Sequence, residues 1–384
     1  MRLAIITTHP IQYYAPVFQL LAERIDVKVF YTWGDGAQKK FDPGFGKTVT
    51  WDIPLLEGYT YEWVKNTAPN PGSHHFKGII NPGLIHQIES WQADAVLVYG
   101  WAYDSHLKAI RHFKNKIPVY FRGDSTLLDS KTGAKQLLRS FFLRWVYSHV
   151  DHAFYVGSNN CAYFKKYGLK ARQLSFAPHA IDNDRFAAER GVEASKIRLD
   201  LGIKPADVLV LFAGKFEDKK SPLLLLNAFL TLNMPNVHLL FVGNGILEDA
   251  LKIAAAKNSH IHFINFQNQL AMPALYQACN LFCLPSQGPG ETWGLAVNEA
   301  MAAGKPVLVS DKCGCAVDLV NPGVTGEIFE TGNISSLTKK LDALTGDKNR
   351  LTILGHNAKI NIANWSFSKQ ANAILAVVNN IDAN

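Results

Sequence analysis

Short β-rich runs alternate with amphipathic, helix-like segments along the chain, and this alternation most constrains the fold. It is typical of parallel sheets covered by helices. The predicted strands are 3–7, 27–31, 95–100, 118–123 and 152–157 in the first half, and 208–214, 238–245, 260–266, 281–286 and 306–311 in the second. The sequence therefore predicts an α/β protein of two doubly wound, Rossmann-like domains. We expect their parallel sheets to face a central cleft, because ligands bind at the carboxyl ends of parallel strands.

The polar stretch from Asp182 to Pro205 lies between the two series of strands. With 384 residues, of which 48% are hydrophobic, the chain is long enough for two cores. We expect a first domain at 1–180, a linker region at 181–205 and a second domain at 206–364. A C-terminal helix at 365–384 should cross back to the first domain.

Charge and cysteine content limit the classes of partner. Lys and Arg number 39 against 32 Asp and Glu, a surplus of 7 that suits phosphorylated ligands or an anionic membrane surface. No apolar run approaches the roughly 18 residues of a membrane span, and MRLAIITTHP is too short for a signal peptide, so we expect a cytoplasmic protein. The five cysteines lack C-x-x-C or zinc-finger spacing. We therefore expect reduced thiols and no metal site.

The segment FAGKFEDKKSP leaves a predicted buried strand through Gly214 and enters a helix. It places Lys215, Lys219 and Lys220 near a helix amino terminus, which attracts anions. A phosphate site fits, although a solvated helix start would look similar. A Walker A loop is the rival interpretation, but Lys219 stands where that motif needs its second glycine, so we discount it.

Two further patterns carry weaker signals. The glycines of FVGNG, Gly243 and Gly245, allow close approach of a ligand, but G-x-G alone is more often an ordinary strand-to-helix turn. Asp182 and Asp184 form a D-x-D that could suggest a metal-bound nucleotide sugar. Their place in the linker region favours a structural role.

Glu291 and Glu299 stand eight positions apart in GPGETWGLAVNEAMAAGKP. A fully helical step of this length is about 12 Å, longer than the roughly 5 to 9.5 Å between the carboxyl groups of a glycoside hydrolase. Eight residues are a little over two turns, so both carboxylates can face one side. The pair therefore suits the two ends of an extended polyhydroxylated ligand better than a shared proton. Two ordinary surface glutamates are the alternative.

These residues resemble the nucleotide-sugar-dependent glycosyltransferases of family 4, which have the GT-B fold. The family signature E-G-F-G-L-x-x-x-E-A-M-A-x-G-x-P is similar to ETWGLAVNEAMAAGKP, and G-R-x-x-x-x-K-G is similar to the segment from Gly214 to Ser221. VGNG, SDKCGCAVDLV and APHAIDNDRF resemble three more family motifs, the last of which accounts for the D-x-D without metal. The resemblance is strong over about 175–330 and architectural before that.

The resemblance implies a donor site in the second domain and an acceptor site in the first. Glu291 would hold the hydroxyls of the transferred sugar, Glu299 would accept from the ribose, and Lys215 and Lys220 would neutralise the diphosphate. Phe266 would lie beside the base. The implied catalytic residues are Lys215, Lys220 and Glu291, and the implied donor-binding residues are Gly214, Lys215, Lys220, Gly243, Phe266, Glu291, Thr292, Trp293, Gly294, Leu295 and Glu299.

The implied activity is a retaining, metal-independent glycosyltransferase without a cofactor. It would move a sugar from a nucleoside-diphosphate sugar to a glycan or lipid-linked acceptor in surface polysaccharide or glycolipid assembly. We expect no nucleic-acid partner. The alternatives are another GT-B enzyme, such as an epimerase or a sucrose-synthase-like catalyst, and a non-catalytic sugar-binding protein.

The first half departs from the family pattern. Many relatives have a glycine-rich loop after the first strand, whereas this chain has TTHPIQYYAP, which places His9, Gln12 and Tyr13 at the carboxyl end of a strand. Many relatives place a histidine after the strand that here reads PVYFRGDS, where Arg122 and Asp124 stand instead. These five residues are the candidates for the acceptor side, each also open to a structural role.

The predicted helix at 135–150 has an apolar face beside several basic residues. The apolar face consists of Leu138, Phe141, Phe142, Trp145 and Val146, and the basic residues are Lys135, Arg139 and Arg144. A core-packed helix and an interfacial membrane helix share this pattern. We favour packing; the alternative is peripheral contact with the inner face of a membrane.

Overall fold

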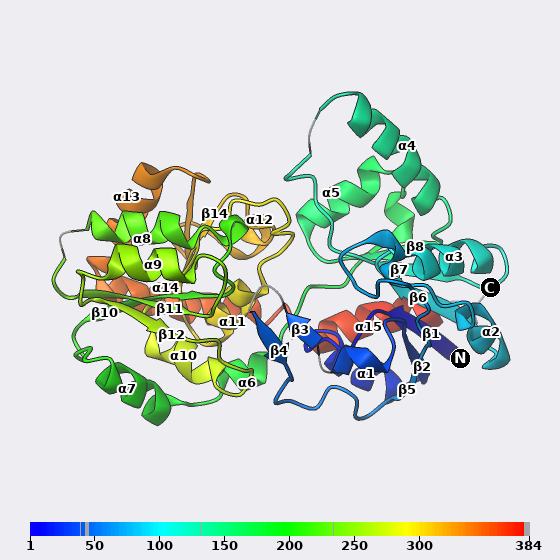
Figure 1. Ribbon diagram of the computed structural model, residues 1–384, viewed down its shortest axis with the longest axis horizontal. Coiled ribbons are helices and arrows are strands. Elements are labelled where there is room, and N and C mark those ends of the chain that lie inside the picture. Colours follow the sequence, from blue (N-terminus) through cyan, green and yellow to red (C-terminus); the bar gives the residue numbers. More distant parts are fainter. Residues whose placement is uncertain (39, 43–45, 131, 233, 380–384) are drawn as a thin grey trace. The chain divides into compact units, whose positions relative to one another are not determined.

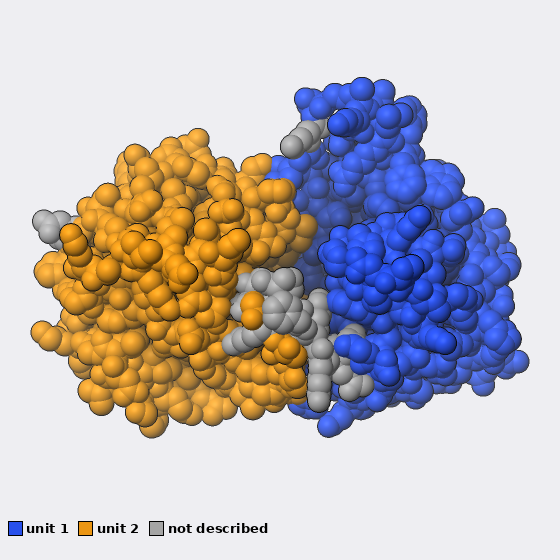
Figure 2. All heavy atoms as spheres, viewed as in Figure 1, with its two compact units in different colours: residues 1–40, 54–179, 367–384 blue, residues 41–53, 180–366 orange. Residues whose placement is uncertain are grey.

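The computed structural model describes residues 1–38, 40–42, 46–130, 132–232 and 234–379, and it divides into two compact units (Figure 2). Unit 1 comprises 1–40, 54–179 and 367–384, and unit 2 comprises 41–53 and 180–366. Within segment 40–49, β3 (Lys40–Asp42) and β4 (Lys47–Val49) form a separate two-stranded sheet.

Unit 1 is built on a seven-stranded sheet of order β5-β2-β1-β6-β7-β8-β9 whose strands pair in parallel (Figure 1). The strands are β1 (Arg2–Thr7), β2 (Asp26–Tyr31), β5 (Thr60–Trp63), β6 (Ala95–Tyr99), β7 (Val119–Arg122), β8 (His152–Tyr155) and β9 (Leu174–Phe176). The helices are α1 (Ala15–Ala22), α2 (Leu84–Ser90), α3 (Asp104–Phe113), α4 (Ala134–Tyr147), α5 (Ser158–Lys166) and α15 (Phe367–Val378).

The last helix, α15, packs against α1 within unit 1. Arg24, just after α1, donates from Nη1 to Asn372 Oδ1 at 2.7 Å. Residues 380–384 of the expected C-terminal helix lie outside the described residues.

Unit 2 is built on a six-stranded parallel sheet of order β12-β11-β10-β13-β14-β15. The strands are β10 (Val208–Ala213), β11 (Val237–Val242), β12 (Ile261–Ile264), β13 (Leu281–Leu284), β14 (Val307–Ser310) and β15 (Gly326–Phe329). The helices are α6 (Asn183–Ala187), α7 (Gly191–Asp200), α8 (Pro222–Leu230), α9 (Glu248–Ala255), α10 (Met272–Ala278), α11 (Leu295–Ala302), α12 (Ala316–Leu319), α13 (Ile334–Thr345) and α14 (Lys348–Ile362).

Helices cover both faces of the unit 2 sheet, with α8, α9 and α13 on one side and α7 and α10 on the other (Figure 1). Every residue of β10 and β11 is consequently buried, which explains their unbroken apolar sequences. The region at 181–205, expected as a linker, holds α6 and α7, and α7 packs on α10 within unit 2.

Each predicted strand overlaps an observed strand, whereas β3, β4, β5, β9 and β15 have no predicted counterpart. The last three are edge strands of the two large sheets and have three or four residues. Strands this short carry no continuous apolar run that marks them in the sequence, and β5 and β9 are also partly exposed.

Both sheets change direction at one internal point, between β1 and β6 in unit 1 and between β10 and β13 in unit 2. This is the doubly wound order, in which successive crossovers leave from opposite sides of a central strand. Loops diverge there and leave a crevice at the carboxyl ends of the strands, where such folds bind ligands.

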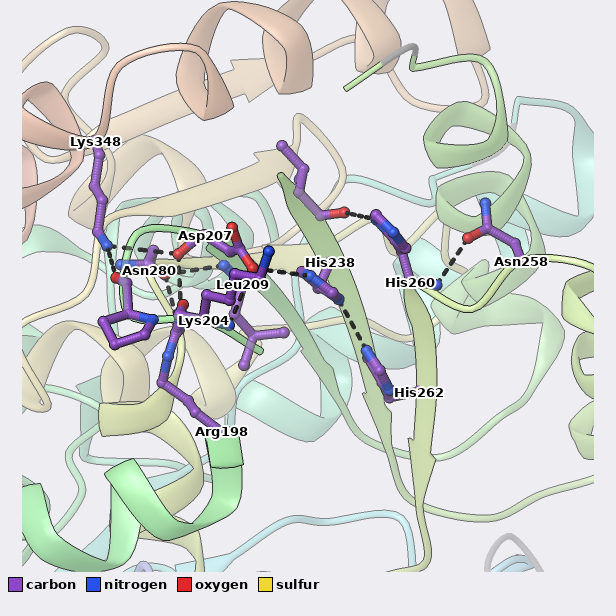
Figure 3. A network of polar contacts seen from close by, with 12 residues as sticks. Arg198, Lys204, Asp207, Leu209, His238, Asn258, His260, His262, Asn280 and Lys348 are labelled. Carbon is purple, nitrogen blue, oxygen red and sulfur yellow. Dashed lines mark hydrogen bonds and ion pairs between the residues drawn. The ribbon is translucent and has the colours of Figure 1, made fainter. Parts of the chain in front are cut away.

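Three histidines gather at the opposite, amino-terminal edge of β11 and β12 (Figure 3). The rings of His238 and His260 stack at 4.5 Å, and His238 Nδ1 lies 3.0 Å from His262 Nε2. Asp207 Oδ2 lies 3.4 Å from His238 Nε2. Burial lowers the pKa of His238, and burial together with repulsion from His238 and His260 lowers the pKa of His262 to about 4.

The histidine cluster should make unit 2 sensitive to acid. An unfolded histidine has a pKa near 6.5, so between about pH 6.5 and 4 the unfolded chain binds more protons, and stability falls as the pH falls. We expect His262→Gln to reduce this pH dependence in thermal unfolding, since each 1 kcal/mol corresponds to about 2 to 4 °C of Tm. The control is His86→Gln, exposed on α2. Identical pH profiles for all three proteins would contradict the assignment.

Candidate functional site at the carboxyl edge of the unit 2 sheet

Loops that follow neighbouring strands bring the expected donor residues to one edge of the unit 2 sheet. Lys215 and Lys220 follow β10, Gly243 follows β11, and Glu291 follows β13. Because β10 and β13 flank the point where the strand order reverses, these loops border the crevice expected there.

Glu291 is held by contacts from two loops. Its Oε2 accepts a hydrogen bond from Ser286 Oγ at 2.8 Å and contacts the ammonium group of Lys220. The Ser286 carbonyl in turn accepts a hydrogen bond from Ser310 Oγ, at the end of β14. The Glu291 side chain is only 8% exposed, so this carboxylate is held almost out of water by one cation and one hydroxyl group.

The loop after β14 lies along the backbone of the segment that carries Glu291. The Gly314 amide donates to the Glu291 carbonyl at 3.1 Å, and the Cys315 amide donates to the Trp293 carbonyl at 3.0 Å. A Cβ atom at Gly314 would come within 1.7 Å of the Thr292 carbonyl oxygen, so only glycine permits this approach. Sequence reasoning noted this loop as a family motif but did not predict its contact with Glu291.

Trp293 and Gly294 shape the entry into α11. The Trp293 indole N–H donates to Asn298 Oδ1 at 2.9 Å, and its ring packs on Trp365 at 5.1 Å. Gly294 has φ +98°, a left-handed conformation that starts α11 at Leu295. The Trp293 side chain therefore anchors the segment that carries Glu291.

Glu299 lies in the second turn of α11, as expected from the sequence, and is buried. Its Oε2 accepts a hydrogen bond from Tyr276 Oη of α10 at 2.8 Å. A buried carboxylate requires such partners. Sequence reasoning did not identify Tyr276, because nothing near it in the chain points to Glu299.

The lysine-rich loop after β10 leads into α8 through Ser221. Ser221 has φ +49°, a left-handed conformation at the position where the resembling family has glycine. Lys219 lies 3.3 Å from Glu217, and its carbonyl accepts a hydrogen bond from the Gln287 amide at 2.8 Å. Lys215 is half-buried at the start of the loop.

The G-x-G after β11 packs against this loop. A Cβ atom at Gly243 would lie 2.0 Å from the Gly214 carbonyl oxygen, and one at Gly245 would lie 2.5 Å from that of Phe216. Asn244 Oδ1 accepts a hydrogen bond from the amide of Phe266, which is half-buried, at 2.8 Å. Asn244, which the sequence did not single out, therefore positions the segment expected beside the base.

The D-x-D has a local structural role. Asp182 is the N-cap of α6, where its Oδ1 accepts a hydrogen bond from the Arg185 amide at 3.0 Å. Across the described residues, no group of three or more His, Cys, Asp and Glu side chains is arranged to hold a metal ion.

In unit 1, Arg122 is buried at the end of β7 and has a structural role. Its guanidinium donates to the carbonyl oxygens of Ala177 and Pro178 at 2.7 and 3.0 Å. These bonds fix the segment that carries His179, whose Nε2 lies 3.8 Å from Asp124 Oδ2. Burial lowers the pKa of His179 although Asp124 opposes this. Burial thus favours the neutral imidazole of His179, a residue that the sequence did not suggest.

The remaining acceptor-side candidates lie around the end of β1. His9 Nδ1 lies 2.8 Å from Thr8 Oγ1, and its ring meets Trp33 edge-on at 5.4 Å. Gln12 and Tyr13 are half-buried in the turn that leads into α1.

The apolar face of α4 is exposed, so the packing that we favoured from the sequence is wrong for this helix. Four of the five predicted face residues are open to solvent, and only Val146 is buried. The exposed fractions are 71% for Leu138, 64% for Phe141, 42% for Phe142 and 41% for Trp145. An amphipathic pattern shows that a helix has an apolar face, but it does not show whether another part of the protein packs against that face. No described helix combines the length and apolarity of a membrane span.

Comparison with known proteins connects the unit 2 site with a family. Residues 193–361 match the family model of glycosyl transferases group 1. The group 1 region thus contains the loops that carry Lys220 and Glu291. Unit 1 lies wholly outside it.

Curated proteins similar to this chain include the D-inositol 3-phosphate glycosyltransferase of Nocardia farcinica. It is 28% identical over 54% of this chain and 48% of its own length. The phosphatidyl-myo-inositol mannosyltransferase of Mycobacterium tuberculosis (strain H37Rv) is 31% identical over 35% of this chain and 34% of its own. The chain thus spans half or less of the length of these relatives.

Among solved structures, Anabaena Alr3699/HepE in complex with UDP and glucose superposes with a TM-score of 0.74. It is 18% identical and covers 99% of both chains. The predicted GT-B fold of two Rossmann-like domains is thereby confirmed.

The contact between Gly314 and Thr292 can be tested by substitution. Gly314→Ala places a methyl group against a backbone carbonyl, which must move, so we expect a loss of about 1 to 3 kcal/mol in the free energy of unfolding. The control is Gly83→Ala, whose Cβ meets nothing within 4 Å. Equal denaturant midpoints for the two variants would refute this close approach.

Proposed function

We propose that this protein is a glycosyltransferase that moves a sugar from a nucleoside-diphosphate sugar to a hydroxyl acceptor. The observation that carries the proposal is the buried contact between Lys220 and Glu291 at the switch point of the unit 2 sheet, inside the region that matches the glycosyltransferase model. A cation and a carboxylate side by side suit a donor that carries phosphate and sugar hydroxyls next to each other.

The proposed roles follow from the chemistry of each group. A lysine ammonium has more donors than its contact with Glu291 uses, so Lys220 can also meet a phosphate oxygen, and Lys215 lies on the same loop. Their charge stabilises the diphosphate as it leaves, without a metal ion or cofactor. Glu291 accepts hydrogen bonds from the sugar, and Glu299 accepts them from the ribose, where Tyr276 orients its carboxylate.

The finer parts of the proposal rest on the resemblance of the second half to family 4. They are retention of anomeric configuration and a glycan or lipid-linked acceptor in surface polysaccharide or glycolipid assembly. The inositol-containing acceptors named for the relatives fit a hydroxyl acceptor. In unit 1, the His179 and Asp124 pair is suited to receive the acceptor's proton.

The test of this proposal separates the structural and catalytic roles of the ion pair. Lys220→Met leaves the Glu291 carboxylate with less compensation, so we expect a loss of about 1 to 3 kcal/mol in stability. Turnover of the preferred nucleoside-diphosphate sugar, chosen from a panel, should fall by about 10² to 10³ because charge aimed at the leaving group is lost. Lys220→Met/Glu291→Gln should recover most of the stability and none of the turnover.

The matched control is Lys219→Met, which removes the adjacent lysine and its pair with Glu217. It should change turnover little, and a chelator should leave the activity of the parent intact. Near-normal turnover by Lys220→Met, or dependence on added divalent metal, would contradict this part of the proposal. Donor binding without turnover by the parent would favour a sugar-binding protein.

Glu299 and Tyr276 give an independent test of the nucleotide end. Glu299→Ala should weaken binding of the bare nucleoside diphosphate in calorimetry, since a charged hydrogen bond contributes about 1.5 to 3 kcal/mol. Tyr276→Phe removes only the hydroxyl that holds Glu299, so its effect on affinity should be smaller. If both variants lose stability and bind the nucleotide like the parent, Glu299 is merely structural.

We further propose that the exposed face of α4 rests on an anionic membrane surface. Leu138, Phe141, Phe142 and Trp145 share one stripe of the helix, and exposed Lys135 and Arg139 lie beside it. Arg111 adds a third cation, 5.2 Å from the Trp145 ring. Apolar insertion flanked by basic side chains is what an interfacial helix requires.

Vesicle sedimentation tests this surface. Leu138→Ser/Phe141→Ser should bind vesicles of phosphatidylglycerol at least about tenfold more weakly than the parent, because burial of each such side chain contributes about 1.5 to 3 kcal/mol. Ile353→Ser/Ile360→Ser, which changes exposed positions of α14, serves as the control. Equal binding by both double variants would exclude α4 as the contact.

A further inference from the structure

A hollow lies in unit 2, at the edge of the sheet opposite to the proposed donor loops. It has a volume of about 340 Å³ and is bordered by α7, α10 and the start of α14. Its lining residues Pro205, Asn280 and Lys305 come just before β10, β13 and β14, whereas Lys220 and Glu291 follow β10 and β13. The hollow is therefore distinct from the proposed donor site.

The hollow carries net positive charge, because Arg198, Lys305 and Lys348 line it and none of its described lining residues is a carboxylate. Burial lowers the pKa of all three cations, and the charge of Arg198 lowers the pKa values of both lysines further. Asp207 and Glu189 oppose these shifts without lining the hollow.

Among the described residues, the hydrogen-bond partners of these cations are carbonyl oxygens. Arg198 donates to the carbonyls of Ala278, Lys204 and Asp207 and to the Asn280 side chain, at 2.8 to 3.2 Å. Lys305 donates to the Gln277 carbonyl at 2.9 Å, and Lys348 donates to the Pro205 carbonyl. Carbonyl oxygens carry only partial charge, so a net positive charge remains in the hollow.

Of the two nearby carboxylates, Glu189 accepts a hydrogen bond from the Gly191 amide at 2.9 Å, and Asp207 is directed toward His238 (Figure 3). Asp207 Oδ2 accepts a hydrogen bond from the Lys204 amide at 3.0 Å and lies 3.4 Å from His238 Nε2. Only the backbone carbonyl of Asp207 meets Arg198 and Lys348. An anion from solution is therefore the natural counterion of these cations.

We propose that this hollow binds a small phosphate ester as a second ligand site, separate from the donor site. Lys305 and Lys348 meet the phosphate, while Arg198, whose guanidinium is committed to backbone carbonyls, supplies charge. Leu199, Ile203 and Pro205 provide apolar surface for the rest of the ligand. The volume is at the lower end of the roughly 300 to 1,000 Å³ typical of small-molecule sites, which suits one ring and one phosphate.

An adjoining hollow of about 330 Å³ extends the site. It shares Ser195, Arg198, Gln277 and Lys305 with the hollow of about 340 Å³ and adds Lys359 together with one carboxylate, that of Glu189. Exposed Ser195, on α7, thus borders both hollows and offers a position from which a new side chain can reach the cations.

Calorimetry and thermal unfolding with inorganic phosphate and with glucose 6-phosphate test the proposal. We expect binding by the parent and by Lys220→Met, and at least tenfold weaker binding by Lys305→Met/Lys348→Met. Lys196→Met removes a lysine that pairs with Asp200 on the exposed side of α7 and is the matched control. If glucose 6-phosphate binds more tightly than inorganic phosphate, the apolar surface of the hollow contacts the rest of the ester. Equal affinities would contradict the proposal that the ligand is an ester.

Ser195→Glu gives a test of opposite sign. A carboxylate placed at the rim should supply the missing counterion, so the phosphate-free protein should melt at a higher temperature and the phosphate response should disappear. The proposal is overturned if Lys305→Met/Lys348→Met binds phosphate like the parent, or if binding is lost only in Lys220→Met. A response to phosphate no larger than that to chloride at equal ionic strength would also overturn it.

Discussion

The contact between Lys220 and Glu291 is the interaction on which the proposed donor site depends. It joins the loop after β10 to the loop after β13, the two strands that flank the switch point of unit 2. Both side chains are largely shielded from water, so each charge requires the other. The same two groups that fix the loops are those that a nucleoside-diphosphate sugar would engage.

Around this pair, backbone packing leaves little freedom. Gly314 lies against Thr292, and Gly243 lies against Gly214, at distances that no side chain allows. Such contacts hold the loops in place before a ligand arrives, and preorganised charge is usually the largest contribution to catalysis. At the opposite edge, Arg198, Lys305 and Lys348 lie together, so cations gather at two edges of unit 2 with different surroundings.

The core strands could be predicted from the sequence because an unbroken apolar run such as that of β10, placed between helix-like segments, indicates a buried parallel strand. The edge strands β5, β9 and β15 could not, since they are short and none carries an unbroken apolar run. Lys220 and Glu291 stand out in the sequence because one lies in a lysine-rich segment before a predicted helix and the other in a glycine-rich one. Ser286, Tyr276 and Asn244 are ordinary polar residues whose roles arise only from tertiary proximity, and the exposed face of α4 looks like a packed face in sequence.

We propose that a nucleoside-diphosphate sugar binds at the carboxyl edge of the unit 2 sheet. Hydrogen–deuterium exchange of the whole protein, with and without the nucleotide sugar that raises its melting temperature most, tests this directly. We expect slower exchange in the loops at this edge, which are 214–221, 243–247, 264–268 and 286–299. Protection confined to 195–205, 277–280 and 305–307, or protection in none of these loops, would contradict the proposal.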